Sequence, residues 1–256
     1  MEDKKIVMLA GKGASTNIVY NALQSEFNIV SIILEKPVNK KQFLKRRITK
    51  LGLWNVLGQI LFQLTIVKFL NSTSVKRKKE ILSKYDLDDR EIPGDKIIHV
   101  TSVNDKDCLD ALQQLNPDLV IVNGTRIISG KILNSIPAKF INTHVGITPK
   151  YRGVHGGYWA LVNNDKENCG VTIHFVDSGI DTGEIIYQRT INVSSWDNFV
   201  TYPLIQLAEG IPYLKRAIRD IVTNTAEKRI TSGKSILWHH PTIWQYLYFR
   251  MKKGIK

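Results

Sequence analysis

Residues 5–34 read KIVMLAGKGASTNIVYNALQSEFNIVSIIL, and this stretch decides the fold class of the chain. A continuous apolar run at Lys5–Ala10 predicts a strand, a helical pattern follows at Thr16–Ser25, and a second apolar run at Asn28–Leu34 predicts another strand. Strands that are apolar on both faces are typical of a parallel sheet covered by helices on each side. The order strand, helix, strand therefore predicts a doubly wound α/β sheet.

The same alternation continues along the chain. Further strands are expected at Lys96–Val100, Asp118–Val122, Phe140–Thr143, Val171–Phe175 and Ile185–Ile191. Further helices are expected at Asp105–Leu115, Gly156–Asn163 and Val200–Thr223. We therefore predict a mostly parallel, Rossmann-like sheet in a catalytic domain of residues 1–195, followed by a C-terminal helix and an aromatic, basic tail in residues 196–256.

Composition sets the broad class of the protein. The chain has 256 residues, 43% of them hydrophobic, so it can bury a full core and is not a disordered protein. The two cysteines, Cys108 and Cys169, lie far apart, which argues for a reducing compartment and against a disulfide framework or a cysteine-based zinc site. The apolar run Ile6–Ala10 is too short for a signal peptide, so we expect a cytoplasmic protein.

Positive charge is concentrated in one part of the chain. The net charge is +13, and residues 36–84 hold thirteen basic side chains and one acidic side chain, Glu80, so this segment alone carries +12 (13 − 1). A basic patch in an otherwise nearly neutral chain indicates binding to phosphate groups or to anionic lipid. We therefore expect no nucleic-acid partner, and peripheral contact between residues 36–84 and the inner face of an anionic membrane is a hypothesis.

Residues 36–92 interrupt the alternation, because they are far longer than a crossover helix requires. The middle of this basic helical insert, Leu51–Leu70, holds thirteen large apolar side chains in 20 residues, with Asn55, Gln59 and Gln63 as a narrow polar stripe. The pattern is compatible with an interfacial membrane helix, with the contact of a homodimer, or with a helix that packs on its own domain. The sequence leaves these alternatives open.

The tail from Ser235 to Lys256 interleaves aromatic and basic side chains. The aromatic residues are Trp238, Trp244, Tyr246, Tyr248 and Phe249, and the basic residues after them are Arg250, Lys252, Lys253 and Lys256. This composition suits a membrane headgroup region, and it suits equally a tail that docks across the core.

Polar residues able to do chemistry gather in Phe140–Gly183. Asn142 and His144 are two residues apart on a predicted strand, so their side chains leave by the same face. An amide and an imidazole side by side at a strand end can stabilise a developing oxyanion together. Asp181 follows the next strand in a loop bounded by glycines, within reach to orient the imidazole and hold it charged.

In this order, the motifs of the segment resemble those of the folate-dependent formyltransferase family. The motifs are Asn142-Thr-His144, Pro149-Lys-Tyr-Arg152-Gly153, Gly170-Val-Thr172-Ile-His174 and Asp181-Thr-Gly183. The resemblance is strong over residues 115–195, weaker over residues 5–35, and absent over the basic insert and the tail. The family includes glycinamide ribonucleotide formyltransferase, methionyl-tRNA formyltransferase and the nucleotide-sugar N-formyltransferases.

The resemblance implies an enzyme that transfers a formyl group from the co-substrate N10-formyltetrahydrofolate to a primary amine, without a metal. Asn142 and protonated His144 would stabilise the tetrahedral oxyanion, and Asp181 would raise the pKa of His144 and relay protons. The folate-binding residues implied by the family are Thr125, Arg126, Ile127, Ile128, Val176 and Asp177. His155 and His174 lie nearby, but no carboxylate or cysteine cluster accompanies them, so we expect no metal site.

The resemblance also implies a binding site for the amine substrate. Its members are Gly13, Ser15, Thr16, Asn17, Tyr151, Arg152 and Glu209. Glycines before a helix can bind a phosphate, and this loop together with Glu209 resembles glycinamide ribonucleotide formyltransferase. Tyr151 and Arg152 resemble the sugar-type members instead.

The sequence favours a nucleotide-linked or lipid-linked amino sugar of surface polysaccharide synthesis as the acceptor. Phosphoribosylglycinamide formyltransferase of purine synthesis is the main alternative. A methionyl-tRNA enzyme is disfavoured, because little chain follows the last predicted strand to form a tRNA-binding domain. A non-enzymatic membrane or nucleic-acid binder with an inactive core is the alternative from another class of protein.

Overall fold

The computed structural model describes residues 4–38, 40–229 and 233–256; Asn39 and the side chains of Lys40 and Gln42, all in the predicted insert, lie outside the description. Within these residues, seven strands form one sheet in the order β3-β2-β1-β4-β5-β7-β8. The strands are β1 (Ile6–Gly11), β2 (Ile29–Glu35), β3 (Ile97–Val100), β4 (Leu119–Asn123), β5 (Lys139–His144), β7 (Gly170–Phe175) and β8 (Ile185–Thr190). The first five in this order are parallel, whereas β7 and β8 are antiparallel to their neighbours. The predicted Rossmann-like sheet is confirmed, and each predicted strand ends within one residue of the observed one.

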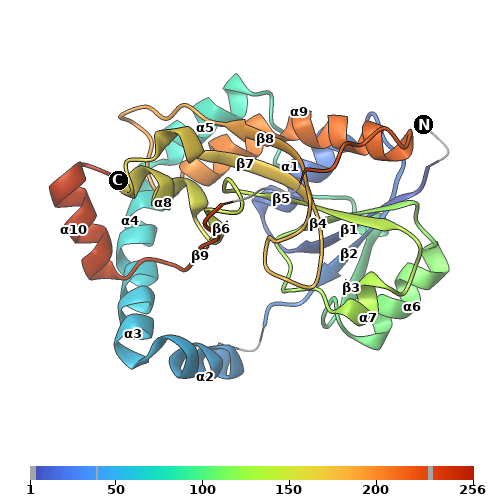
Figure 1. The fold of residues 1–256 in the computed structure, drawn as a ribbon, viewed down its shortest axis with the longest axis horizontal. Helices are drawn as coiled ribbons and strands as arrows, with labels where there is room; N and C mark the ends of the chain where they lie inside the picture. Colours follow the sequence, from blue (N-terminus) through green and yellow to red (C-terminus); the bar gives the residue numbers. More distant parts are fainter. Residues whose placement is uncertain (1–3, 39, 230–232) are drawn as a thin grey trace.

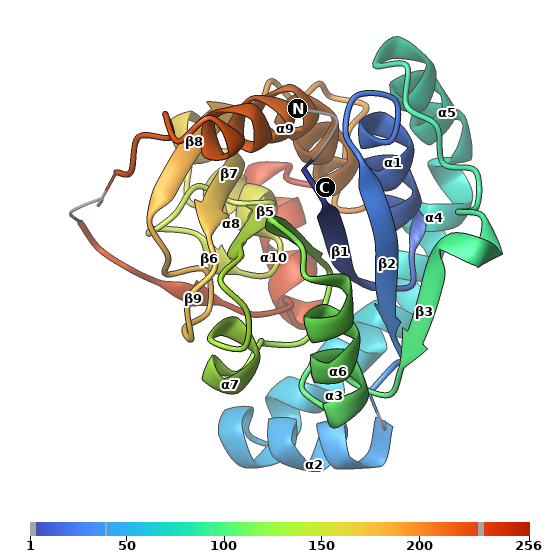
Figure 2. The ribbon, with the colours of Figure 1, turned by 90° about the vertical axis from the view of Figure 1, so that its right-hand side faces the viewer.

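Helices cover both faces of this sheet (Figures 1 and 2). The flanking helices are α1 (Ala14–Leu23), α6 (Lys106–Leu115), α7 (Gly130–Leu133) and α9 (Tyr202–Val222). Ile18 of α1 and Leu214 of α9 join the buried cluster on one face, and Leu112 of α6 joins the cluster on the other. Burial of both faces is the reason why the strands read as continuous apolar runs. Because α9 packs on this sheet, residues 196–256 share a core with residues 1–195.

The sheet changes direction between β5 and β7. The antiparallel pairing of these strands places Asn142 opposite His174, and His144 opposite Thr172. Residues that face each other across two strands have neighbouring side chains. Polar residues of two strands therefore meet at the carboxyl end of β5, and this edge is where doubly wound sheets bind their ligands.

The basic insert is a series of helices between β2 and β3. They are α2 (Lys40–Leu51), α3 (Leu53–Phe62), the π-helical turn η1 (Gln63–Val67), α4 (Lys68–Thr73), α5 (Val75–Lys84) and the short η2 (Gly94–Lys96). In both ribbon views α2 lies beyond the carboxyl end of β2, away from the sheet (Figures 1 and 2). One side of α3 packs on the domain, because Phe62 is fully buried against the rings of Phe199 and Tyr246.

The C-terminal tail crosses the domain and reaches the insert. The elements concerned are β6 (Arg152–Gly153), α8 (Gly156–Val162), η3 (Lys166–Asn168), β9 (Leu237–Trp238) and α10 (Ile243–Lys253). β9 pairs with β6, and the Trp238 ring stacks on Trp159 at a centroid distance of 4.8 Å. α10 then packs on α3, where the Trp244 ring lies so close to Gly58 that a β-carbon there would be 2.3 Å from it. The tail is therefore docked, as one of the two alternatives expected.

Candidate active site

Asn142, His144 and Asp181 converge at the carboxyl end of β5. Asn142 and His144 belong to β5, and Asp181 belongs to the loop between β7 and β8. The Nδ1 atom of His144 lies 3.3 Å from Oδ2 of Asp181. Asp181 has φ 51°, a left-handed conformation that is uncommon outside glycine and is often found at functional sites. The structure thus brings together the three residues that were predicted to be catalytic.

The opposite side of the His144 ring faces the backbone. Its Nε2 atom is 2.7 Å from the carbonyl oxygen of Tyr151, so Nε2 carries a proton and donates it there. Gly146 leaves room for this arrangement, because a β-carbon at this position would lie 2.6 Å from Nε2 and 2.3 Å from the Tyr151 oxygen. Both ring nitrogens therefore face an acceptor, and the doubly protonated ring is the form that can donate to both.

Burial opposes this charged form of the ring. His144 is only 5% exposed, and burial lowers its pKa by more than the Asp181 carboxylate and the Tyr151 carbonyl raise it. As expected from the sequence, the Asp181 carboxylate acts to raise the pKa of His144. The net change in this pKa is downward, because the effect of desolvation is larger than that of the carboxylate. Burial also acts to raise the pKa of Asp181, yet His174, His144 and the Gly153 N–H together lower it below its ordinary value.

His174 connects the amide to the carboxylate. Its Nε2 atom lies 3.2 Å from Nδ2 of Asn142 and 3.7 Å from Oδ1 of Asp181. Its Nδ1 atom lies 2.7 Å from the carbonyl oxygen of Phe175, and in the neutral tautomer in which Nδ1–H donates there, Nε2 accepts from Asn142. This fixes the direction of the Asn142 amide and leaves its second N–H for another acceptor.

The loop that carries Asp181 is held in place by Arg152 and Gly153. The guanidinium of Arg152 donates to the Ile180 carbonyl at 2.9 Å, and the N–H of Gly153 donates to Asp181 Oδ2 at 2.9 Å. A cavity of about 250 Å³ opens beside Asp181, and its lining includes Arg152, Thr148 and Arg229. The carboxylate is therefore both anchored and accessible from an opening.

The loop predicted to bind folate follows β4 and is fixed by Glu35. The buried Glu35 carboxylate accepts from the backbone N–H of Arg126 at 2.7 Å and forms an ion pair with its guanidinium at 2.6 Å. Asn104 accepts from the N–H of Ser129 and donates to the carbonyl of Ile127. The Ile127 side chain is 55% exposed, so the loop presents an apolar side chain on a rigid backbone.

The other predicted folate residues differ in exposure. Thr125 is half-buried and donates to the carbonyl of Arg126, whereas the side chain of Ile128 is in the hydrophobic core. Val176 is partly buried against the same core cluster. Asp177 is exposed. Its carboxylate accepts hydrogen bonds from the N–H of Gly179 and from the hydroxyl of Thr182 in the same loop.

The glycine loop before α1 is only partly free to bind a ligand. Gly13 and Ser15 are exposed. The buried Thr16 hydroxyl donates to the carbonyl of Gly11 and accepts from Asn123, so its role is to join β1 to β4. Asn17 donates to the backbone of Asp89, near the end of the insert. The Thr16 side chain is therefore engaged within the core, and the part of this residue in substrate binding stays a prediction.

Two further predicted substrate residues are engaged with the chain itself. Glu209 on α9 accepts from the hydroxyl of Tyr85 at 3.0 Å and from Arg189 at 3.3 Å. The side chain of Tyr151 is fully buried and donates to Asp165. The prediction that the Tyr151 side chain contacts a substrate is corrected: this residue serves the site through its carbonyl oxygen, which holds His144.

Among the residues that the structure describes, no group of three or more His, Cys, Asp or Glu side chains is placed to hold a metal ion. His155 was expected to lie near the site. Its Nε2 atom lies 3.1 Å from Nδ1 of His240, a residue of the C-terminal tail.

A sequence profile of the formyl transferase family matches residues 70–203, just over half of the chain. The chain belongs to the formyl transferase family. The matched range contains Asn142, His144 and Asp181, and the family that their spacing suggested is confirmed.

Curated relatives of this formyl transferase chain are methionyl-tRNA formyltransferases, the class that the sequence disfavoured. The protein of Finegoldia magna is 39% identical over 94 residues, which is 36% of this chain and 30% of that protein. The protein of Azobacteroides pseudotrichonymphae is 32% identical over 137 residues, which is 54% of this chain and 41% of that protein. The matches thus span less than half of the length of these relatives.

Solved structures of several formyltransferases share the fold. A sugar N-formyltransferase from Shewanella has a TM-score of 0.56 at 16% identity over 92% of this chain and 76% of that one. Glycinamide ribonucleotide transformylase 1 from Symbiobacterium toebii has a TM-score of 0.57 at 19% identity over 90% and 94% of the two chains. The formyltransferase PseJ from Anoxybacillus kamchatkensis, solved with a UDP-linked formamido sugar and tetrahydrofolate, has a TM-score of 0.52 at 19% identity over 98% and 93%.

Sequence reasoning missed the residues that support the site of this formyl transferase chain. His174 was part of a family motif and was considered as a metal ligand but was given no role in the reaction, although its place two residues after Thr172 on a strand signalled that it shares a face with other polar residues. Glu35 and Asn104 gave no local signal, because each acts on a loop that is distant in sequence. The carbonyl of Tyr151 could not be found from side-chain chemistry.

Proposed function

We propose that this chain transfers the formyl group of N10-formyltetrahydrofolate to a primary amine of a small substrate. The observation that carries the proposal is the connected cluster Asn142–His174–Asp181–His144 at the carboxyl edge of the sheet. Acyl transfer needs a donor for the developing oxyanion and a group that moves a proton, and this cluster supplies both. The family membership supports the same reaction class.

The Asn142 amide and the His144 imidazole have different roles in the proposed reaction. The second N–H of Asn142 is the donor for the negative charge that develops on the formyl oxygen, because the first is held by His174. His144 supplies a positive charge when it is protonated, and Asp181 and the Tyr151 carbonyl then accept both of its N–H groups. Burial lowers the pKa of His144 and so favours the neutral ring, which can accept the proton that the attacking amine releases and pass it to the departing folate nitrogen.

The loops beside the cluster fit a flat, partly apolar donor molecule. Glu35 and Asn104 fix the backbone on either side of the exposed Ile127 side chain, and Asp177 stiffens the facing loop. We infer that Thr125, Ile127 and Val176 contact the pterin and that Arg126 holds the loop of Thr125 and Ile127 in place. N10-formyltetrahydrofolate supplies the formyl carbon when it is bound.

We propose a nucleotide-linked amino sugar as the acceptor rather than glycinamide ribonucleotide. Three of the residues that the resemblance assigns to a ribonucleotide are engaged within the chain: Glu209 is held by Tyr85 and Arg189, and Thr16 and Asn17 are bonded to other segments. The solved relative PseJ is bound to a UDP-linked formamido sugar, which supports this class of acceptor.

The test is a comparison of acceptors with N10-formyltetrahydrofolate as the donor. The panel contains UDP- and dTDP-linked amino sugars, glycinamide ribonucleotide and methionyl-tRNA, with an N-acetylated sugar nucleotide as the control that lacks a free amine. The proposal expects kcat/KM for one amino sugar to exceed the others by a factor on the order of 10². Preference for glycinamide ribonucleotide, lost in Glu209→Gln, would establish the purine alternative. Preference for methionyl-tRNA would establish the activity of the curated relatives.

A further inference from the structure

The apolar helix of the insert presents its hydrophobic side to the outside of the molecule. Trp54, Leu57, Leu61 and Leu64 follow one another at spacings of three, four and three residues, so they share one face. Their exposed fractions are 75%, 40%, 39% and 55%. A helix on the surface of a globular protein normally buries this side, so an exposed apolar stripe marks a surface that meets another apolar medium.

Gln59 and Gln63, two of the three residues of the polar stripe, face inward. Gln59 is buried, donates to the carbonyl of His240 at 2.8 Å and accepts from Arg47 at 2.6 Å. Gln63 lies 3.1 Å from Nδ1 of His240. Because these hydrogen bonds fix the rotation of the helix about its axis, the hydrophobic residues cannot turn inward without breaking them. The outward orientation is therefore built into the fold.

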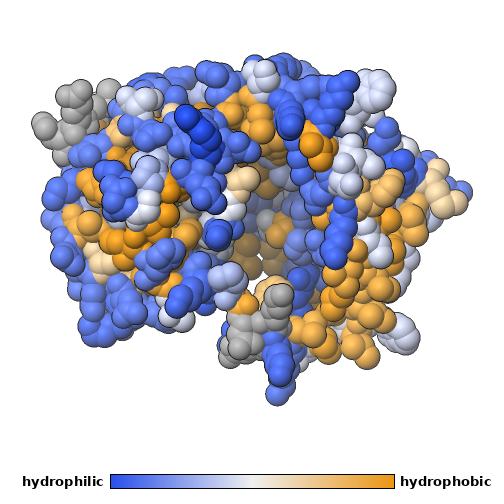
Figure 3. Space-filling view, turned by 180° about the vertical axis from the view of Figure 1, so that it is seen from behind, coloured by the Kyte–Doolittle hydropathy of each residue, from blue (hydrophilic) through white to orange (hydrophobic). Residues whose placement is uncertain are grey.

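The C-terminal helix widens this surface. α10 packs on α3 through Trp244 and Gly58, and it leaves Leu247 and Met251 exposed by 43% and 85%. Figure 3 shows a band of hydrophobic side chains along the side of the molecule that α3, α4 and α10 form. We call this band the apolar face, defined by Trp54, Leu57, Leu61, Leu64, Leu247 and Met251.

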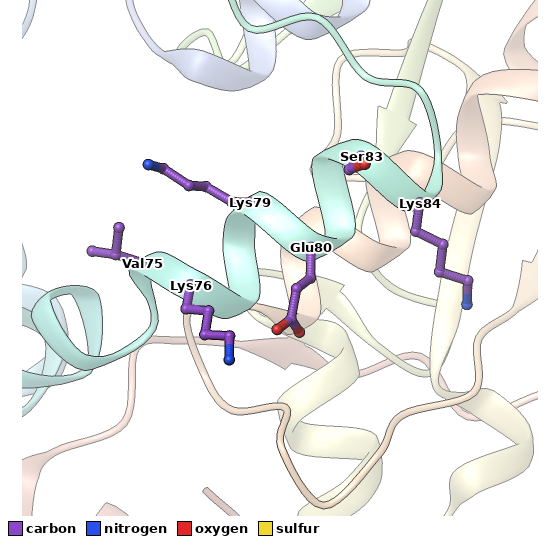
Figure 4. Close-up of a pocket in the computed structure, with 6 residues that line it drawn as sticks. All are labelled: Val75, Lys76, Lys79, Glu80, Ser83 and Lys84. Atoms are coloured by element: carbon purple, nitrogen blue, oxygen red, sulfur yellow. The ribbon is translucent and has the colours of Figure 1, made fainter.

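Exposed basic side chains lie on the helices that precede and follow this helical stretch in the chain, α2 and α5, and on α4 and α10 themselves. Lys68 lies on α4, and Lys76 and Lys79 extend from the next helix, α5, into the solvent (Figure 4). Lys50 at the end of α2 and Arg250 on α10 are also exposed. An apolar strip with cationic residues on the adjoining helices matches the two layers of an anionic lipid surface, which are acyl chains below and negatively charged headgroups above.

The helix is suited to lie on a bilayer rather than to cross it. Leu53–Thr73 is the one helix in the described residues that is long and apolar enough to span a membrane, and 28% of its 18-residue apolar window is buried in the protein. Phe62 packs on Phe199 and Tyr246, and the polar stripe is bonded to the tail. A spanning helix would have to leave all of these contacts, whereas an interfacial helix keeps them.

We propose that the apolar face docks this protein on the surface of an anionic membrane. Hydrophobic residues of α3, η1 and α10 enter the boundary between headgroups and acyl chains, and the lysines and arginines of the adjoining helices contact the headgroups. The proposal goes beyond formyl transfer and does not depend on it, because it rests on residues outside the site.

The experiment measures the binding of the purified full chain to phosphatidylcholine vesicles with and without phosphatidylglycerol by flotation. We expect partition onto the anionic vesicles at least tenfold above that onto the neutral ones, and a tenfold or greater loss in Leu57→Ser/Leu61→Ser. Lys76→Glu/Lys79→Glu should lower binding to the anionic vesicles. The matched control, Lys106→Glu/Lys131→Glu, removes the same charge from α6 and α7 at the opposite end of the molecule and should bind as the wild type does (Figure 1).

Circular dichroism of each variant separates loss of binding from loss of fold, and the changed side chains are exposed, so the fold should persist. Failure of the folded wild type to bind either vesicle would overturn the proposal. Equal binding by Leu57→Ser/Leu61→Ser would overturn it as well. A dimer in solution that this double variant dissociates would show that a second copy, rather than lipid, covers the apolar face.

Discussion

The Asp181 carboxylate joins the two sides of the candidate site. Its Oδ2 atom accepts from the Gly153 N–H at 2.9 Å and faces His144 at 3.3 Å, while Oδ1 faces His174. The left-handed backbone of Asp181 aims the carboxylate inward, and Arg152 holds the preceding carbonyl. A group held from several directions at a strained position is suited to fix the charge of a neighbouring imidazole.

Asp181→Asn should make protonation of the His144 ring less favourable and should slow formyl transfer. Without the carboxylate, the larger of the two influences that raise the pKa of His144 is lost and only the Tyr151 carbonyl remains, so the pKa should fall further below its ordinary value. We expect kcat to drop by a factor on the order of 10². An NMR titration of the His144 ring checks the direction, and an unchanged or higher pKa would contradict this role of Asp181.

His174 is a positioning residue, since it acts through the Asn142 amide. His174→Leu removes the acceptor at 3.2 Å, so the amide becomes free to rotate. We expect kcat to fall about tenfold with little change in KM for the folate donor. His174→Gln retains an acceptor and should recover much of the loss. A Leu variant with wild-type kcat would assign His174 a structural role only.

At the scale of elements, the sequence predicted what depends on local pattern. The strands were found because each is buried on both faces and therefore reads as a short apolar run. Asn142 and His144 were found because a strand places residues two apart on one face. The pairing of β6 with β9 was not found, because it joins residues 152–153 to residues 237–238 by backbone hydrogen bonds that leave no side-chain signature.

The orientation of the insert also depended on distant residues. The polar stripe of Gln59 and Gln63 was visible in the sequence, but its direction is set by the backbone and ring of His240 and by Arg47. Likewise, the support of the folate loop by Glu35 depends on the parallel order of β2, β1 and β4 rather than on any motif. Such contacts between distant segments follow from the order of the strands in the sheet, and a single sequence does not show this order directly.

Glu35→Gln tests the link between β2 and the folate loop. The substitution leaves the Arg126 guanidinium without its negative partner in a largely buried setting, so the free energy of unfolding should fall by roughly 2–3 kcal/mol. KM for the folate donor should rise several-fold, because the loop is no longer held. Urea unfolding and steady-state kinetics check the two effects. The exposed pair of Lys4 and Asp118 is the control, and Asp118→Asn should cost less than about 1 kcal/mol.

At the scale of the whole molecule, buried histidines make stability depend on pH. Burial lowers the pKa of His240 to about 4 and holds the pKa values of His155 and His144 below their ordinary value of 6.5. The unfolded chain therefore takes up protons at a higher pH than the folded protein does. Stability is fully present above pH 6.5 and is lost as the pH falls from 6.5 toward 4.

The expected loss of stability at low pH is large enough to measure. A pKa that falls from 6.5 to about 4 corresponds to roughly 3 kcal/mol for His240 alone at low pH. The free energy of unfolding in urea should decline between pH 6.5 and pH 4, and the decline should be smaller in His240→Gln. A free energy that stays constant over this range would show that the buried rings are not neutral in the folded protein.

The most direct test of the account is the rate of formyl transfer by Asn142→Ala and by His144→Ala, with N10-formyltetrahydrofolate and the best acceptor of the wild type. If the amide and the imidazole both act on the formyl oxygen, each variant should lose a factor on the order of 10² or more in kcat/KM while remaining folded. Turnover by His144→Ala at the wild-type rate would contradict the assignment of this cluster as the catalytic site.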